Sequence, residues 1–152
     1  MAAQEHVALV RSLFELFNSR QSDPAWLEKS LAAFAADCEL VSAPSGTTFH
    51  GEDGPQAATA VFSRGFPDVR TELTTVFATE EQVVLEGILR GTSTGSPTLP
   101  TGALKASGRS IEPRCCFVWQ LRHGKIASVH TYYDLTTLLN QLSLQSATAQ
   151  AT

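Results

Sequence analysis

The sequence predicts one α+β domain in which helices come first and antiparallel strands follow. Apolar residues recur with helical spacing in segments up to residue 63, and strand-like runs fill much of residues 69–133. Helices that precede such a run pack together on one side of a curved sheet. The chain has 152 residues, enough for one core of this kind. We place the domain at residues 1–144, followed by a flexible, small and polar tail at residues 145–152.

The helices are predicted from apolar side chains spaced three and four residues apart. Residues 4–18 form the first helix, whose apolar face carries Val7, Val10, Leu13, Phe14 and Phe17. A second helix is expected to start at Asp23-Pro24, because Asp is a good N-cap and Pro is tolerated at the first helical position. A short strand at residues 37–43 separates it from a third helix at residues 54–63.

The second half of the chain is predicted to form the sheet. Its strands lie at residues 69–77, 83–94, 110–122 and 125–133. Residues 95–108 contain Pro, Gly, Ser and Thr at the density of a long loop. Loops of that length often cover a binding site. A short helix at residues 136–142 closes the domain.

Composition and charge exclude several classes of function. The net charge is −4 and the Lys and Arg residues are scattered, so we expect no nucleic-acid partner. No apolar run approaches the ~20 residues of a membrane span, and no signal peptide is recognisable. The three cysteines are Cys38, Cys115 and Cys116, a spacing that suits neither a disulfide framework nor a zinc site. We therefore expect a cytoplasmic protein with reduced thiols and no metal.

The final hairpin carries the candidate site. A two-residue turn at His123-Gly124 makes directly opposed residues share one face of the hairpin. The predicted pairs are Trp119 with Ser128, Phe117 with His130, and Cys115 with Tyr132. Asp134 extends the same face by the two-residue period of a strand. An apolar wall with polar groups at one end is typical of a small-molecule pocket. A slip of one residue would exchange the two faces.

Asp134 is the candidate general acid/base of this pocket. Desolvation by apolar neighbours raises the pKa of a carboxyl group, which can then accept a proton from a carbon acid. His130 and Tyr132 would orient the carboxylate or donate hydrogen bonds to a developing enolate oxygen. The candidate substrate-binding residues are Trp119, Phe117, Cys115 and, from a loop at the pocket mouth, His50.

Structural roles fit the same residues. Asp134 stands before a short helix and also suits its N-cap. His130 on a half-buried strand suits a hydrogen-bonded structural histidine, and His50 suits a solvated loop. Tyr132 and Trp119 suit core positions. A dry Asp134 with a raised pKa would favour catalysis, whereas a carboxylate bonded to the backbone N–H groups of residues 136 and 137 would favour the cap.

Three motifs occur in order along the chain: FPDVRTEL (66–73), GTSTG (91–95) and RHGKIASVHTYYDLTTLLNQL (122–142). Together they resemble the SnoaL-like polyketide cyclases, a group of the nuclear-transport-factor-like superfamily. The resemblance implies a cone of three helices against a strongly curved, mostly antiparallel sheet, with a short C-terminal helix and often a homodimer. One departure is Ser93, where the family commonly has His in the second motif.

The resemblance also implies a reaction. Polyketide cyclases of this group close a ring by intramolecular aldol chemistry without metal or cofactor, using the Asp of a Tyr-x-Asp motif that matches Asp134. We therefore expect a cofactor-independent cyclase or isomerase of a polyketide-like or related small apolar intermediate. One alternative is an epoxide-opening cyclase or hydrolase on the same fold. The other is a non-catalytic ligand-binding or dimerisation module.

Overall fold

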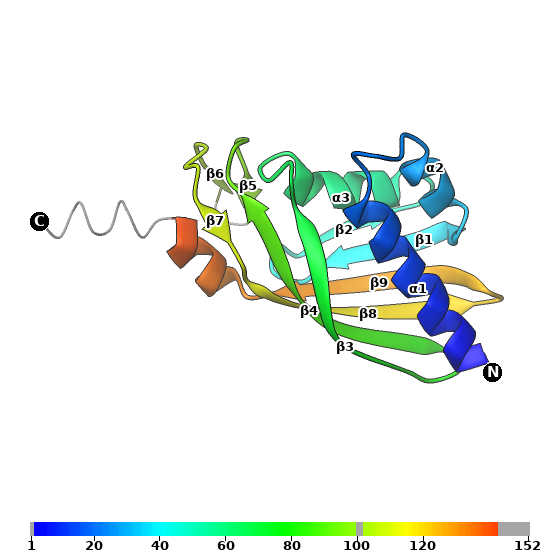
Figure 1. The fold of residues 1–152 in the computed structure, drawn as a ribbon. Helices are drawn as coiled ribbons and strands as arrows, with labels where there is room; N and C mark the ends of the chain where they lie inside the picture. Colours follow the sequence, from blue (N-terminus) through cyan, green and yellow to red (C-terminus); the bar gives the residue numbers. More distant parts are fainter. Residues whose placement is uncertain (1, 100–101, 143–152) are drawn as a thin grey trace, which may run out of the picture.

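The computed structural model describes residues 2–99 and 102–142 and has the predicted α+β architecture. Its helices α1 (Ala2–Asn18), α2 (Trp26–Leu31) and α3 (Gly54–Ser63) pack on one side of a strongly curved sheet (Figure 1). A further helix starts at residue 135 and continues to residue 142. The predicted tail at residues 145–152 lies outside the described residues. In the part of the chain that the structure describes, no helix is long and apolar enough to cross a membrane.

The sheet is antiparallel except at one junction. Its spatial order is β2 (Thr47–His50), β1 (Phe34–Ser42), β9 (Lys125–Tyr133), β8 (Arg114–Arg122), β4 (Gln82–Thr92) and β3 (Arg70–Ala78). Only the β1–β9 pair among these strands is parallel. Strand β7 (Ser110–Ile111) also pairs with β4, and β5 (Thr98–Leu99) and β6 (Gly102–Ala103) form a separate ribbon. The predicted mostly antiparallel sheet is confirmed.

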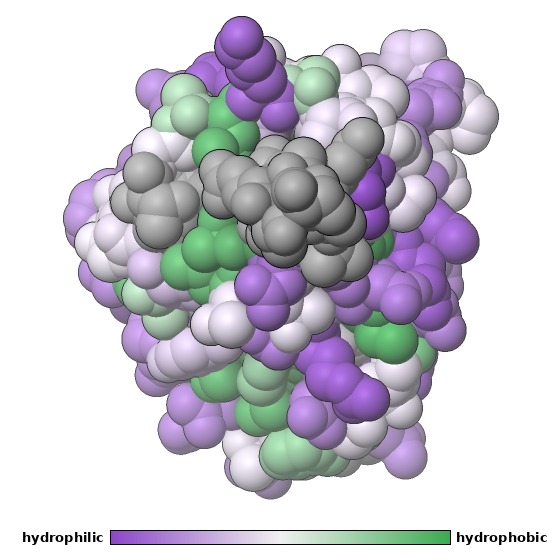
Figure 2. Space-filling model, turned by 90° about the vertical axis from the view of Figure 1, so that its left-hand side faces the viewer, coloured by the Kyte–Doolittle hydropathy of each residue, from purple (hydrophilic) through white to green (hydrophobic). Residues whose placement is uncertain are grey.

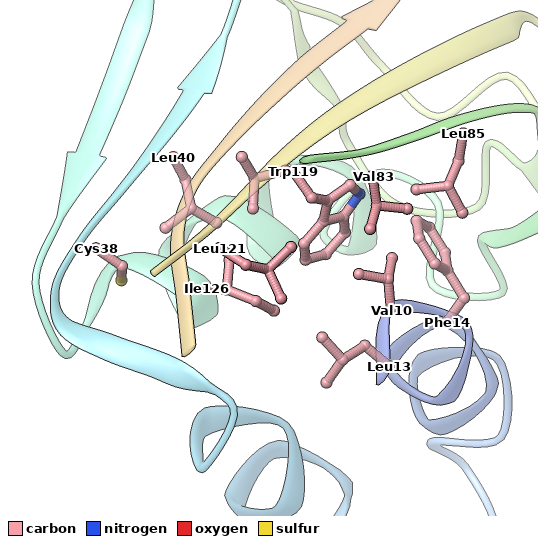
Figure 3. Close-up of a cluster of buried hydrophobic side chains, with 11 residues drawn as sticks. Val10, Leu13, Phe14, Cys38, Leu40, Val83, Leu85, Trp119, Leu121 and Ile126 are labelled. Carbon is pink, nitrogen blue, oxygen red and sulfur yellow. The ribbon is translucent and has the colours of Figure 1, made fainter. Parts of the chain in front are cut away.

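Two clusters of buried side chains pack the helices against the concave face of the sheet. The first joins α1 to the centre of the sheet through Val10, Leu13, Phe14, Leu85 and Trp119 (Figure 3). The second lies at the end nearer the C-terminal helix and includes Phe66, Leu89, Tyr133 and Leu138. Fully burying a side chain such as Leu contributes about 1.5–3 kcal/mol, so these clusters hold the helices on the sheet.

Several boundaries differ from the prediction for local reasons. Strand β1 begins at Phe34, three residues early, because the backbone of Ala33 already accepts a hydrogen bond from Ile126 of β9. Strand β2 was not predicted, since its polar sequence TTFH forms a strand only by pairing with β1. The strand predicted at residues 110–122 is interrupted before β8 at Pro113, which has no N–H for a sheet hydrogen bond.

The described parts of the segment at residues 95–108 contain more regular structure than the predicted loop. The segment contains the β5–β6 ribbon and packs against the end of α3, where Gly95 donates its N–H to the carbonyl of Gly65 at 3.0 Å. Ser93 is fully buried at its base, and its Oγ accepts a hydrogen bond from the N–H of Ser107 at 3.1 Å. Figure 2 views the molecule from the left of Figure 1, the side of this segment, where hydrophobic and polar surface alternate.

Candidate functional site

A cavity of about 170 Å³ lies between the three helices and the concave face of the sheet. Its walls come from α1, α2 and α3 and from strands β1, β3, β4, β8 and β9. The lining is almost entirely aliphatic and aromatic, and none of the lining side chains is charged. A cavity of about 150 Å³ already holds benzene, and drug-sized ligands occupy about 300–1,000 Å³. The volume therefore suits a small molecule of one or two rings.

Few polar side chains line this pocket, and two of them already donate hydrogen bonds to the backbone. The Ser30 hydroxyl donates to the carbonyl of Trp26 at 2.8 Å, and the Thr59 hydroxyl donates to the carbonyl of Gln56 at 2.9 Å. Thr71 and Thr131 add hydroxyls from β3 and β9. Trp119 also lines the pocket, but its indole nitrogen is buried away from the cavity surface and has no hydrogen-bond partner within the described residues. The pocket thus offers neutral donors and acceptors to a ligand.

The two faces of the β8–β9 hairpin differ from the prediction. Pairing starts as expected, with Arg122 opposite Lys125 and Leu121 opposite Ile126. The register then shifts by one residue, because Gln120 pairs with Ser128 and leaves Ala127 as an extra residue in β9. Such a β-bulge moves every later side chain of the strand to the other face. The predicted pairs beyond the turn are wrong: Trp119 pairs with Val129, Phe117 with Thr131 and Cys115 with Tyr133.

His130 and Tyr132 consequently lie on the convex face of the sheet. His130 is opposite Val118, and Tyr132 is opposite Cys116 with 45% of its surface exposed. Neither residue lines the pocket that contains Trp119 and Phe117. Their predicted position beside the apolar wall is contradicted, and the cause is the bulge at Ala127.

Asp134 is exposed and caps the C-terminal helix. Its Oδ1 accepts a hydrogen bond from the backbone N–H of Thr137 at 3.0 Å, and its Oδ2 accepts one from the Thr137 hydroxyl at 2.6 Å. Both bonds lower the pKa of Asp134, and the bond from the Thr137 hydroxyl has the larger effect. The predicted dry carboxylate with a raised pKa is therefore wrong. The bond from the N–H of Thr137 is one of the two expected for a helix cap, and the Thr137 hydroxyl supplies the second bond that is observed.

Of the four predicted substrate-binding residues, Phe117 and Trp119 line the pocket. Cys115 is on the concave face as expected but lies within the second buried cluster, outside the pocket wall. Burial raises the pKa of its thiol to about 12, so Cys115 stays neutral. His50 is exposed at the end of β2, opposite Glu39, and does not reach the pocket. The expectations for Cys115 and His50 are contradicted by these positions.

Sequence reasoning missed most of the pocket wall. It assigned the apolar stripe of α1 to the core, although Phe14 and Phe17 also face the cavity. The predicted pairing of Phe117 with His130 left Thr131 on the other face of the hairpin, because the bulge was not recognised. The signal for the bulge was present: Ile126 and Val129 are both apolar but three residues apart, a spacing that a regular strand cannot bury on one face. No described residue of the 95–108 segment lines the cavity, so the expectation that this segment covers a binding site is not met there.

Within the described residues, no group of three or more His, Cys, Asp and Glu side chains is arranged to hold a metal ion. The absence of a metal or cofactor from the reaction stays a prediction of the family resemblance.

Comparison with known proteins agrees with this architecture. A protein from Jannaschia sp. CCS1, described as a SnoaL-like polyketide cyclase, superposes with a TM-score of 0.78 at 20% identity, over 93% of each chain. A protein from Xanthomonas campestris pv. campestris, described as a polyketide cyclase, gives a TM-score of 0.75 at 20% identity, over 94% of this chain and 100% of the other.

The same fold also occurs without an assigned activity. An NTF2-like protein of unknown function from Burkholderia pseudomallei gives a TM-score of 0.70 at 22% identity, over 90% of this chain and 96% of the other. A search of curated protein sequences finds no match. A family model of SnoaL-like polyketide cyclases matches residues 8–142, nearly all of the domain. The chain therefore belongs to the SnoaL-like polyketide cyclase family.

Proposed function

We propose that this protein binds a small, uncharged, largely apolar carbonyl compound of polyketide type and acts on it as a cyclase or isomerase. The observation that carries the proposal is the pocket between helices and sheet, whose lining side chains are all uncharged. A charged ligand would lose its hydration there without gaining an ionic partner. Apolar walls with a few neutral polar groups suit a folded carbonyl chain.

Confinement is the contribution that we assign to the pocket wall. The ring of Phe14 packs edge-to-face against Phe117 and Trp119, with ring centroids 5.1 and 5.6 Å apart. Such aromatic contacts give the wall a fixed shape. A chain folded against it has already lost the rotational freedom that ring closure requires, so the barrier falls.

Proton transfer has less support from the pocket. No ionisable side chain is among its lining residues, and the two inward titratable groups beside it, Cys115 and Tyr133, have pKa values raised by burial. Both stay neutral near pH 7. The acid/base role of Asp134 stays a prediction, and it requires the carboxylate to leave Thr137 and enter the pocket.

A second candidate function is ligand binding without catalysis. The uncharged lining favours it, because general acid/base chemistry needs a group whose pKa lies near the working pH. The structure contains one chain, so the homodimer stays a prediction for either function.

The test compares wild type with Asp134→Asn, because Asn retains a cap oxygen and removes the titratable carboxylate. Both proteins are incubated with short linear β-polyketones and with a small apolar epoxide, and products are quantified by chromatography and mass spectrometry. Binding is measured separately through the fluorescence of Trp26 and Trp119, which both line the pocket.

Faster ring closure in both proteins supports a cyclase that works by confinement. A loss of ~10²-fold or more in Asp134→Asn alone, with binding unchanged, would assign proton transfer to Asp134. Binding of the ketones without any product formation supports the binding module. An absence of binding to every neutral compound would overturn the pocket as the functional site.

A further inference from the structure

The hydroxyl group of Thr131 lines the pocket and is accessible to a ligand. It forms no hydrogen bond within the part of the chain that the structure describes. In that part, the polar side-chain atoms that are both fully buried and unpaired are Nδ1 of His6 and Nε1 of Trp119. The oxygen of Thr131 is not among them. It is therefore an unpaired hydroxyl that keeps exposed surface.

The place of Thr131 in the sheet directs this surface into the pocket. Strand β9 is an interior strand, paired with β1 on one side and with β8 on the other. Thr131 shares its face with Val129 and Tyr133, which are both buried against the helices. Its partner on β8 is Phe117, which also lines the pocket. The hydroxyl thus projects from the concave face, beside an aromatic ring.

The neighbours of Thr131 give its hydroxyl little to bond. Phe117 and Val129 are apolar. Ser42 is opposite Thr131 on β1, but its side chain is hydrogen-bonded to Tyr133. A water molecule is held well only by two to four polar partners, so water at Thr131 is bound weakly. A ligand oxygen that replaces this water gains a hydrogen bond at small cost.

The other hydroxyl groups of the pocket are less available. Those of Ser30 and Thr59 already donate to backbone carbonyls. The hydroxyl of Thr71 has no partner among the described residues, but Thr71 is only 6% exposed and lies on the edge strand β3. Thr131 is less buried than Thr71, so it offers the larger contact to a ligand.

We infer that the hydroxyl of Thr131 donates a hydrogen bond to a carbonyl oxygen of the bound molecule and so sets the preference of the pocket for ketones over hydrocarbons. This inference rests on the proposed function and narrows its substrate class to neutral ketones whose carbonyl adjoins a flat apolar group. The ring of Phe117 provides a surface for that group directly opposite Thr131. A carboxylate would bury its charge among side chains that carry no positive charge.

The test uses three naphthalene probes substituted at the same ring position: acetylnaphthalene, ethylnaphthalene and naphthoate. Their affinities are measured by equilibrium dialysis near pH 7 for wild type, Thr131→Val, Thr131→Ser and the matched control Thr71→Val. Val keeps the β-branched shape of Thr without the hydroxyl, and Ser keeps the hydroxyl. The ratio of ketone to hydrocarbon affinity should fall roughly 3- to 10-fold in Thr131→Val, the effect of one net hydrogen bond. The ratio should stay near the wild-type value in Thr131→Ser and Thr71→Val, and naphthoate should bind weakly.

A second readout follows the bound ketone itself. Infrared difference spectra of acetylnaphthalene labelled with ¹³C at the carbonyl should show a lower C=O stretching frequency in wild type than in Thr131→Val, because a donated hydrogen bond weakens the C=O bond. A ketone preference that is unchanged in Thr131→Val, or lost equally in Thr131→Ser or Thr71→Val, overturns the inference and leaves the proposed function standing. A carbonyl frequency that is the same in wild type and Thr131→Val does so too. Failure of both neutral probes to bind wild type, or tightest binding of naphthoate, overturns both.

Discussion

The carboxylate of Asp134 is bonded to Thr137 through both of its oxygens, one to the backbone N–H and one to the hydroxyl. Thr137 is three residues beyond Asp134, which is the spacing of an N-cap residue and the N3 position of its helix. This relationship explains why the sequence places Asp134 directly before Leu135-Thr136-Thr137. It also gives the Tyr-Tyr-Asp motif a structural role that is independent of catalysis.

Replacing Asp134 should therefore affect stability in a manner that depends on the substitute. The melting temperature of Asp134→Ala should fall by about 2–4 °C, the shift expected when a chain of this size loses one cap. Asp134→Asn should melt close to wild type, because Asn is an equally good N-cap. Thermal unfolding followed by circular dichroism measures both variants. A stable Asp134→Ala protein would show that the cap contributes little.

The pH dependence of stability provides a separate check on the same contact. The folded pKa of Asp134 is lowered by Thr137, so its carboxylate stabilises the fold above the unfolded pKa of about 3.9. That contribution is lost as the pH falls through the lower, folded pKa. Any excess in the melting temperature of wild type over Asp134→Asn should thus be greatest above the unfolded pKa of about 3.9 and decline as the pH falls through the lower, folded pKa. An excess that grows on acidification would mean that the folded pKa is raised.

The β-bulge in β9 makes a prediction that distinguishes the observed register from a regular hairpin. Val129 is buried on the concave face, whereas its neighbour His130 lies on the convex face. Val129→Asp places an unpaired charge in the core and should destabilise the protein by about 3–5 kcal/mol. His130→Asp, at a half-buried position of β9, should cost only about 1 kcal/mol, the effect of placing Asp in a strand. Urea unfolding gives the free energy of unfolding of each variant. A larger loss in His130→Asp than in Val129→Asp would indicate a regular hairpin without the bulge.

The contrast between these two neighbours shows where sequence reasoning succeeds and where it stops. Periodicity located α1, gave the bounds of α3 and placed the hairpin turn at His123-Gly124. Each of these features is encoded locally. The bulge is different, because Ala127 is an extra residue only relative to its partner strand β8. One unpaired residue moved His130 and Tyr132 out of the candidate site and brought Thr131 into it.

The pocket wall shows a similar limit. An apolar stripe such as that of α1 predicts burial but does not distinguish a filled core from a cavity, which depends on how three helices and five strands meet. In the sequence, Asp134 of the Tyr-Tyr-Asp motif suits both a catalytic role and a helix cap. Only its hydrogen bonds to Thr137 in the structure identify the cap.

A last prediction concerns the contact that holds α1 over the pocket. The side chain of Asn18, at the end of α1, donates to the carbonyl of Thr71 at 2.9 Å and accepts from the N–H of Thr71 at 3.0 Å. It thereby pairs the free edge of β3 at a residue that lines the pocket. Asn18→Ala leaves both backbone groups of the buried Thr71 without this partner and should destabilise the protein by about 1–3 kcal/mol.

The same substitution should also weaken ligand binding, because Phe14 and Phe17 of α1 form part of the pocket wall. Ser19→Ala is the matched control, since Ser19 is exposed beside Asn18 and only its backbone takes part in the hydrogen bonds described for it. Dialysis with acetylnaphthalene at a temperature where all proteins are folded should show a loss of affinity in Asn18→Ala and none in Ser19→Ala. Equal affinity in Asn18→Ala, despite lower stability, would mean that neighbouring contacts fix the position of α1 and that Asn18 only protects the edge of β3.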